Sequence, residues 1–181
     1  MSFRISLAGD LGSGKTTVAK ILQQRFGVEI ISGGKVQREL ASKMGLTIEE
    51  FNVFMENDPS FDRKLDDMFV AYNDRAGDYI FDCRMGWYFV PSAVSFYLHV
   101  DPMEAARRVF NANRADESFE SVEKAYESLT GRRVSEAKRY KDYYGQDIMD
   151  MSNYNFVIDT TNLTPEEVAE EIVKDLSKVG V

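Results

Sequence analysis

The chain has 181 residues, of which 44% are hydrophobic and 29% are charged, a composition that fits one globular domain with an ordinary buried core. Acidic residues outnumber basic ones by 30 to 22, and the resulting net charge of -8 argues against a nucleic-acid polymer as partner. The single cysteine, Cys83, excludes an intrachain disulfide. No secretory leader or long apolar span is recognised, so we expect a cytoplasmic protein without a membrane partner.

The N-terminal part of the sequence alternates strand and helix patterns. The apolar run FRISLA (3–8) predicts a strand, TTVAKILQQRF (16–26) repeats apolar residues at helical spacing, and VEII (28–31) predicts a second strand. Together they form a strand, helix, strand unit, which is typical of parallel sheets.

Helical patterns follow at 34–44, 47–57 and 59–76. Thr47 with Glu50 has the spacing of a capping box, and Pro59 suits a first helical turn. We therefore expect two or three helices between the second strand and the third.

The C-terminal half returns to the alternating pattern. YIFDC (79–83), SFYLHV (95–100) and NFVIDT (155–160) predict strands, and the step from Asp101 to Pro102 predicts the start of a helix. The final helix is expected at TPEEVAEEIVKDL (164–176), which opens with a second capping-box pattern. The whole order predicts an α/β fold, with a parallel sheet covered by helices on both faces.

Residues 9–16, GDLGSGKT, have the spacing G-x-x-x-x-G-K-T between a predicted strand and a predicted helix. Glycines let the backbone wrap its N–H groups around phosphates, the lysine reaches the outer phosphates, and the threonine hydroxyl binds Mg²⁺. The motif predicts a site for a nucleoside triphosphate and Mg²⁺, formed by Gly9, Gly12, Ser13, Gly14, Lys15, Thr16 and Thr17.

A phosphate-binding loop alone does not separate a kinase from a switch GTPase, a motor or a binding module. The base-reading string N-K-x-D of switch GTPases is absent, and motors usually need a larger chain. Arginines gather in the second half of this acidic protein, at 107, 108, 114, 132, 133 and 139. Arg84 follows a predicted strand, at the carboxyl end where open sheets bind ligands.

Five segments in this order resemble one known family: GDLGSGKTTVAKIL, ISGGKVQREL, DPSFDRKLD, DCRMGW and GRRVSEAKRYKDYYGQDIMD. They are similar to the short cytidylate kinases of the archaeal type, which are P-loop nucleoside monophosphate kinases. The resemblance extends over nearly the whole chain. The phosphate-binding loop is shared by many proteins, whereas SEAKRYKDYYG combined with ISGG and D-x-R-x-G-W is far more restrictive.

The resemblance implies transfer of the γ-phosphoryl group of ATP to CMP or dCMP in the presence of Mg²⁺. It also implies a single domain over 1–181 with a five-stranded P-loop sheet, a monophosphate-binding helical region at 32–76 and a lid at about 112–140.

The same resemblance assigns roles to individual residues. Ser32 and Arg38 match the segment that binds the monophosphate, and Asp82 and Arg84 match the pair that binds the acceptor. Three positions match the lid, namely arginines 132 and 139 with Glu136 between them. Lys15, Arg132, Arg139 and Asp82 are thus the expected catalytic residues, with Thr16 and Asp82 at the metal.

Base recognition departs from the pattern of longer relatives, in which an aspartate follows the arginine of the D-x-R pair. Here that position is Met85, so we expect another carboxylate or amide from the helical region, with Asp58 and Asp62 as candidates. Both carboxylates also fit a plain role as helix-start caps or solvated charges near Pro59.

Several candidates have a simple structural interpretation. Arginines 132, 133 and 139 fit a solvated helix face paired with Glu136 and Asp142, and the resemblance favours function mainly for the first and third. His99 fits a strand end and Cys83 a small packed side chain. The run WYFVP (87–91) fits packing at a sheet edge better than base stacking.

Two other functions stay open: a small-metabolite kinase on the same scaffold, and a non-catalytic regulatory protein that binds nucleotide. Asp82, Arg84 and paired lid arginines argue against the regulatory protein, because simple binding does not need them. The sequence does not indicate whether the protein is a monomer or an oligomer.

Overall fold

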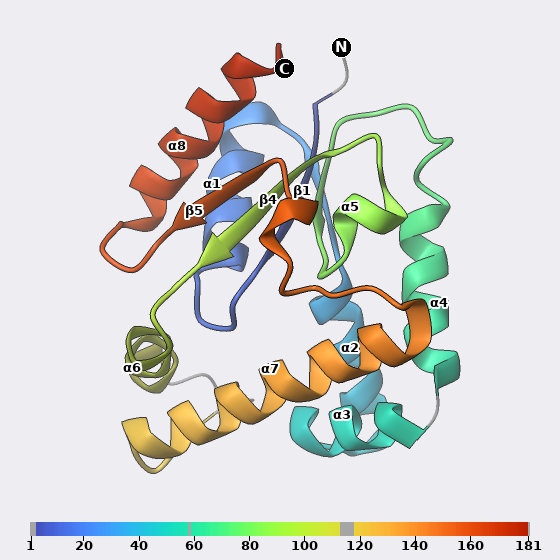
Figure 1. Ribbon diagram of the computed structural model, residues 1–181, viewed down its shortest axis with the longest axis vertical. Coiled ribbons are helices and arrows are strands. Elements are labelled where there is room, and N and C mark those ends of the chain that lie inside the picture. The colour runs from blue at the N-terminus through green and yellow to red at the C-terminus, as the bar shows by residue number, and fades with distance from the viewer. Residues whose placement is uncertain (1–2, 58, 113–117, 181) are drawn as a thin grey trace.

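In the computed structural model, which describes residues 3–57, 59–112 and 118–180, five parallel strands form one sheet (Figure 1). The strand order is β2-β3-β1-β4-β5. The strands are β1 (Arg4–Gly9), β2 (Glu29–Ser32), β3 (Tyr79–Asp82), β4 (Val94–His99) and β5 (Phe156–Asp159). This topology confirms the predicted α/β fold.

The register of the sheet brings the ends of three strands together. Ser32 of β2 pairs with Asp82 of β3, Asp82 pairs with Leu7 of β1, and Gly9 of β1 pairs with Leu98 of β4. Because parallel strands all end at the same edge, the loops after β1, β2 and β3 meet there.

The helices within the described residues lie where the sequence patterns placed them, with a few differences. They are α1 (Lys15–Phe26), α2 (Gly33–Met44), α3 (Ile48–Asn57), α4 (Pro59–Val70), α5 (Gly86–Phe89), α6 (Pro102–Ala112), α7 (Val122–Tyr144), the 3₁₀ helix η1 (Met151–Asn153) and α8 (Pro165–Lys178). Both capping boxes are present, Thr47 with Glu50 and Thr164 with Glu167.

The third helical pattern was expected to continue to residue 76, but α4 ends at Val70. The cause is a long-range contact from the first strand. The buried guanidinium of Arg4 donates to the backbone carbonyl of Tyr72 at 2.6 Å and also reaches the carbonyls of Asn73 and Arg75. The backbone after α4 continues in turns, in which the N–H of Arg75 donates to the same carbonyl of Tyr72, and Arg4 supplies the further donors.

Trp87, Tyr88 and Phe89 belong to the short helix α5, which packs against the inner strands β1 and β4 and not at a sheet edge, as had been expected of WYFVP. Gly86 begins this helix against the first strand, where an added Cβ would lie 2.2 Å from the Cβ of Ser6. Only glycine allows this close approach, which explains the glycine in the D-x-R-x-G-W segment.

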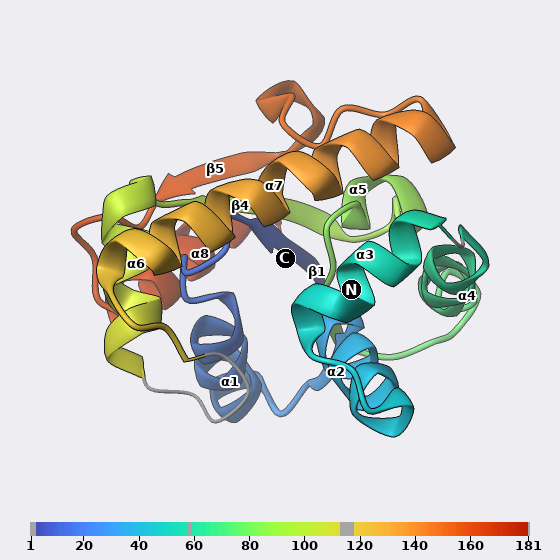
Figure 2. The same ribbon diagram turned by 90° about the horizontal axis from the view of Figure 1, so that it is seen from below.

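Apolar residues cover both faces of the sheet, as predicted. One face packs against α1 and α8, with Leu22 and Ile172 fully buried in that cluster. The other face packs against α4, α5 and the second half of α7, around Phe81 and Met85. Figure 2 shows α1 and α4 well apart, with α7 extending across the space between α6 and α4.

Helix α7 lies across the carboxyl edge of the sheet, below the strand ends in Figure 1. It begins after Ser121, whose hydroxyl accepts from the N–H of Lys124, and ends at Gly145 in the left-handed conformation. The predicted lid, at about 112–140, overlaps this helix, whereas residues 113–117 lie outside the described residues. Within the described residues, none of the helices combines the length and apolar character that a membrane crossing needs.

Candidate active site

The loop between β1 and α1 has the geometry of a phosphate-binding site. Gly9 has a φ of 143°, and an added Cβ would lie 2.2 Å from the carbonyl oxygen of Leu98, so no other residue fits. Gly14 is the N-cap of α1 and offers no side-chain cap, and the first turn holds no acidic residue. The first N–H groups of α1 and its positive end are thus suited to an anion.

Lys15 folds back over this loop. Its Nζ donates to the carbonyl oxygens of Gly9 at 2.8 Å and Asp10 at 2.7 Å. Burial, followed by the nearby charge of Arg84, lowers the pKa of Lys15 to about 7. A phosphate beside Nζ would favour the charged form, so phosphate binding and protonation of Lys15 are coupled.

Arg84 connects the end of β3 to both the loop and helix α7. Its Nη1 donates to the carbonyl oxygen of Gly9 at 2.7 Å, and its Nε pairs with Oε2 of Glu136 at 2.8 Å. Burial alone would lower the pKa of Arg84, but the charge and hydrogen bond of Glu136 outweigh it and raise the pKa. Arg84 is therefore a fixed positive charge directly beside Lys15.

Helix α7 presents Arg132, Glu136 and Arg139 at positions i, i+4 and i+7, which lie on one helix face. Burial would raise the pKa of Glu136, but the charges of Arg84, Arg132 and Arg139 together hold it below its usual value. Arg139 is only 5% exposed. The carboxylate thus pairs with Arg84 and lies within the electrostatic reach of Arg132 and Arg139.

The acceptor side is formed where β2 and β3 end. Ser32 caps α2 and its hydroxyl donates to Oδ2 of Asp82 at 2.9 Å. Burial raises the pKa of the Cys83 thiol well above its usual value, and the charges of Asp82 and Asp66 add to this effect. Cys83 is thus held as a neutral thiol, which agrees with its expected packing role and excludes an activated nucleophile.

One cavity of about 490 Å³ joins these groups. At its centre lie Lys15, Asp82, Arg84, Arg132 and Arg139. One end is lined by Arg108, Leu163, Pro165 and Val168 beside the phosphate-binding loop, and the other by Gln37, Arg38, Leu65, Asp66, Phe69 and Phe89. Its volume lies in the range of ligand sites in proteins.

Most of the residues predicted from the sequence are brought together in this cavity. Its walls include Gly12, Ser13, Gly14, Thr16, Thr17 and Arg38 as well as the central group. Gly9 lies under the loop, where its carbonyl accepts from Lys15 and Arg84, and Ser32 reaches the site through Asp82. Asp58 and the side chain of Asp62 lie outside the described residues.

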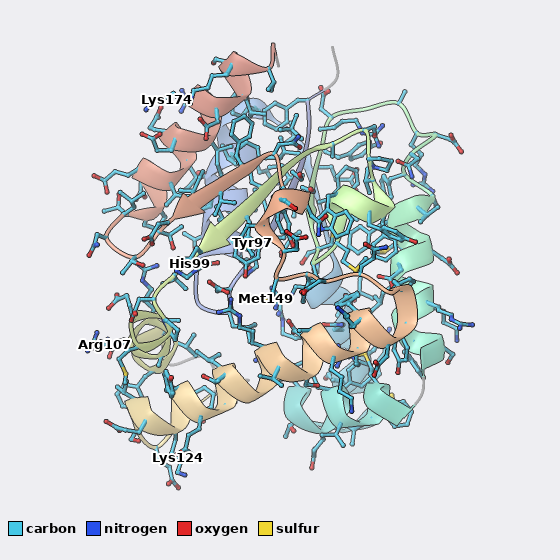
Figure 3. All side chains as sticks on the ribbon, viewed as in Figure 1. Tyr97, His99, Arg107, Lys124, Met149 and Lys174 are labelled. Atoms are coloured by element: carbon cyan, nitrogen blue, oxygen red, sulfur yellow. The ribbon has the colours of Figure 1, made fainter. Side chains whose placement is uncertain are left out.

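The role of Asp10, a buried carboxylate inside the phosphate-binding loop, could not be predicted from the local sequence pattern. Its Oδ1 accepts from the hydroxyl of Tyr97 at 2.7 Å, and its Oδ2 lies 2.8 Å from Nδ1 of His99 and accepts from the N–H of Val100. Figure 3 shows Tyr97 and His99 at the end of β4, on the side toward α7. His99 therefore has the strand-end role that was expected.

The structure also corrects the expected pairing of Arg133. It was expected to pair with Glu136 or Asp142, but its Nη1 lies 3.1 Å from Oδ1 of Asp10, while Glu136 pairs with Arg84. Helix α7 thus contacts the phosphate-binding loop through Arg133 and lines the cavity through the neighbouring Arg132.

The residues fit ATP and Mg²⁺ by their chemistry. The uncapped start of α1, the inward-folded Lys15 and the surrounding guanidinium groups suit a chain of phosphates. Among the described residues, no three His, Cys, Asp or Glu side chains gather as a metal site. An Mg²⁺ ion would therefore depend on nucleotide phosphates for part of its ligands, together with Thr16 and Asp82.

Comparison with known proteins agrees with this geometry. The model of the cytidylate kinase-like family matches residues 4–162. The chain belongs to the cytidylate kinase-like family. This membership, with the kinase fold and the phosphate-binding loop, makes it a nucleotide kinase.

Two relatives and one solved structure illustrate the similarity. The cytidylate kinase of Methanocella arvoryzae is 33% identical over 175 residues, covering 97% of each chain. The S-adenosylmethionine-dependent nucleotide dehydratase of Lacinutrix mariniflava is 34% identical over 98% of this chain, which spans only 37% of the length of that protein. The shikimate kinase of Bacteroides thetaiotaomicron shares the fold, with a TM-score of 0.65 and 15% identity over 97% of this chain and 98% of its own.

Proposed function

We propose that this kinase transfers the γ-phosphoryl group of ATP to CMP or dCMP, giving ADP and CDP or dCDP. The observation that carries the proposal is a single cavity, which extends from the phosphate-binding loop to the end of β3. Four positively charged side chains line it between these points, namely Lys15, Arg84, Arg132 and Arg139. Full-length similarity to a cytidylate kinase supports the choice of acceptor.

The donor end of the cavity would hold ATP. Loop N–H groups and Lys15 would bind the β- and γ-phosphates, and the guanidinium of Arg108 would lie near the nucleoside, beside Leu163 and Pro165. When bound, Mg²⁺ would supply positive charge that neutralises the phosphate oxygens, and Thr16 with Asp82 would hold it.

The acceptor phosphate would lie near Arg38 and Arg84, with one oxygen directed at the γ-phosphorus. A bond forms between that oxygen and phosphorus while the bond to the β-phosphate oxygen breaks. Arg132 and Arg139 would stabilise the charge that spreads over the equatorial oxygens, because a planar guanidinium contacts two oxygens at once. Glu136 acts as the positioning residue for the arginines, and Asp82, besides holding Mg²⁺, also positions the loop after β2 through Ser32.

The experiment is an ADP-release assay with the purified protein and ATP, against CMP, dCMP, UMP, AMP, GMP and shikimate. We expect CMP and dCMP to be used well ahead of the others, and Lys15→Ala to lose roughly a hundredfold or more in turnover while remaining folded. A preference for AMP would contradict the cytidylate assignment, and a preference for shikimate would support a small-metabolite kinase. No turnover with any acceptor, despite ATP binding, would support a regulatory nucleotide-binding protein.

A further inference from the structure

A buried carboxylate, Asp66, lies at the acceptor end of the cavity. It belongs to α4, is only 6% exposed, and lines the cavity beside Leu65 and Phe69. The hydroxyl of Tyr144, at the end of α7, donates to its Oδ2. The helix that carries Asp66 is the one on which Asp62 was expected to read the base, and Asp66 follows Asp62 by one helical turn.

Apolar and polar side chains line this end of the cavity together with Asp66, and the polar ones include Gln37 and Arg38. Phe69, Met85 and Phe89 form the same buried cluster and also line the cavity. The charge of Asp66 adds to the rise in the pKa of the thiol of Cys83, the residue after Asp82, and both residues line the cavity. A planar ring entering this end of the cavity would meet these apolar side chains and the carboxylate of Asp66, with Gln37 and Arg38 also in the wall.

A buried carboxylate accepts hydrogen bonds and donates none, and its two oxygens can accept from several donors at once. Tyr144 and a ligand amino group can therefore share it. Cytosine carries an amino group at its 4-position, whereas uracil carries an oxygen there, which would oppose the carboxylate. Leaving a buried polar group without its partner is costly, so such a contact discriminates strongly.

We propose that Asp66 accepts a hydrogen bond from the 4-amino group of cytosine, and so sets the preference for CMP over UMP. Tyr144 is the positioning residue for this carboxylate. It places Asp66 in contact with the helix that also carries Arg132 and Arg139, so base binding and phosphate binding share one element. This inference rests on the proposed transfer to CMP and adds the residue that selects the base.

The test compares kcat/KM for CMP and for UMP in the parent enzyme, in Asp66→Asn and in Asp67→Asn. Asp67 is exposed on the same helix and is the matched control for loss of one charge. An amide can donate to the uracil oxygen as well as accept from cytosine, so Asp66→Asn should lower the CMP-to-UMP ratio by about 100-fold. The activity of Asp66→Asn with UMP should be retained or increased, which also shows that the variant is folded. Asp67→Asn should keep the parent ratio.

An unchanged CMP-to-UMP ratio in a folded Asp66→Asn enzyme overturns the proposal while leaving the kinase activity standing. Failure of the parent to phosphorylate CMP contradicts the proposed function itself, so the two failures are distinct. If Asp66→Asn does not fold, Asp66→Ser serves as the second variant. In addition, the parent is assayed with the monophosphate of 2-pyrimidinone riboside, which lacks the amino group. If the parent uses this compound with the same kcat/KM as CMP, the proposal is also overturned.

Discussion

The carboxylate of Asp10 should stabilise both the phosphate-binding loop and its contact with α7. Removing it in Asp10→Ala leaves the buried hydroxyl of Tyr97 and the N–H of Val100 without their acceptor, and leaves Arg133 without its ion pair. Asp10→Asn removes the charge but keeps an oxygen that can accept one of these bonds. The two variants therefore separate the hydrogen bonds from the charge.

The expected magnitude follows from the geometry. Each hydrogen bond to the buried carboxylate contributes about 1.5–3 kcal/mol. The side chain of Arg133 is 34% exposed and that of His99 43%, so solvent screens both and they add little. Asp10→Ala should thus lower the free energy of unfolding by about 3–5 kcal/mol. Asp10→Asn should lower it by about 1–2 kcal/mol, because about half of the bonding is kept.

The assay is urea unfolding followed by circular dichroism, with Asp74→Ala as the control. Asp74 is exposed in the turn after α4, so its loss should change the free energy of unfolding by less than about 0.5 kcal/mol. For a protein of this size, Asp10→Ala should also lower Tm by roughly 6–20 °C. A loss below about 1 kcal/mol in Asp10→Ala would show that the four contacts do not stabilise the loop.

Three further predictions concern activity, protonation and packing. Arg139→Ala should lower kcat by more than it weakens binding of ATP or CMP alone, because its guanidinium would act on the transferring group; unchanged kcat with weaker ATP binding would contradict this. Because the pKa of Lys15 is about 7, most of the free protein has an uncharged Lys15 at pH 8, and ATP binding should be accompanied by uptake of about 0.9 proton. Lys15→Met should lack this uptake. At pH 6 Lys15 is already charged, so the parent should take up almost no proton there. Calorimetry in buffers of different ionisation enthalpy measures this uptake, and equal uptake by parent and variant at pH 8 would refute the coupling. Gly86→Ala should lower the free energy of unfolding by about 1–3 kcal/mol through its clash with Ser6, so unchanged stability in urea would argue against that close approach.

The predictions from sequence held where a structure depends on residues close together in the chain. Both capping boxes join residues three apart, and the phosphate-binding loop closes within the eight residues from Gly9 to Thr16. The spacing of apolar residues identified each strand and helix, because it follows from which side of the element is buried. The alternation of strands with helices was then enough to predict a parallel sheet. The family match also required only the order of local motifs.

The partners of charged residues were decided by the tertiary structure. Arg84 pairs with Glu136 at a separation of 52 residues, Asp10 bonds to Tyr97 at 87 residues, and Asp66 bonds to Tyr144 at 78 residues. Local reasoning paired Arg133 with residues on its own helix, where such pairs are exposed and weak. The fold instead turns one face of α7 toward the cavity and brings Arg133 to the loop, because buried charges are stable only where an opposite charge or a donor lies within reach.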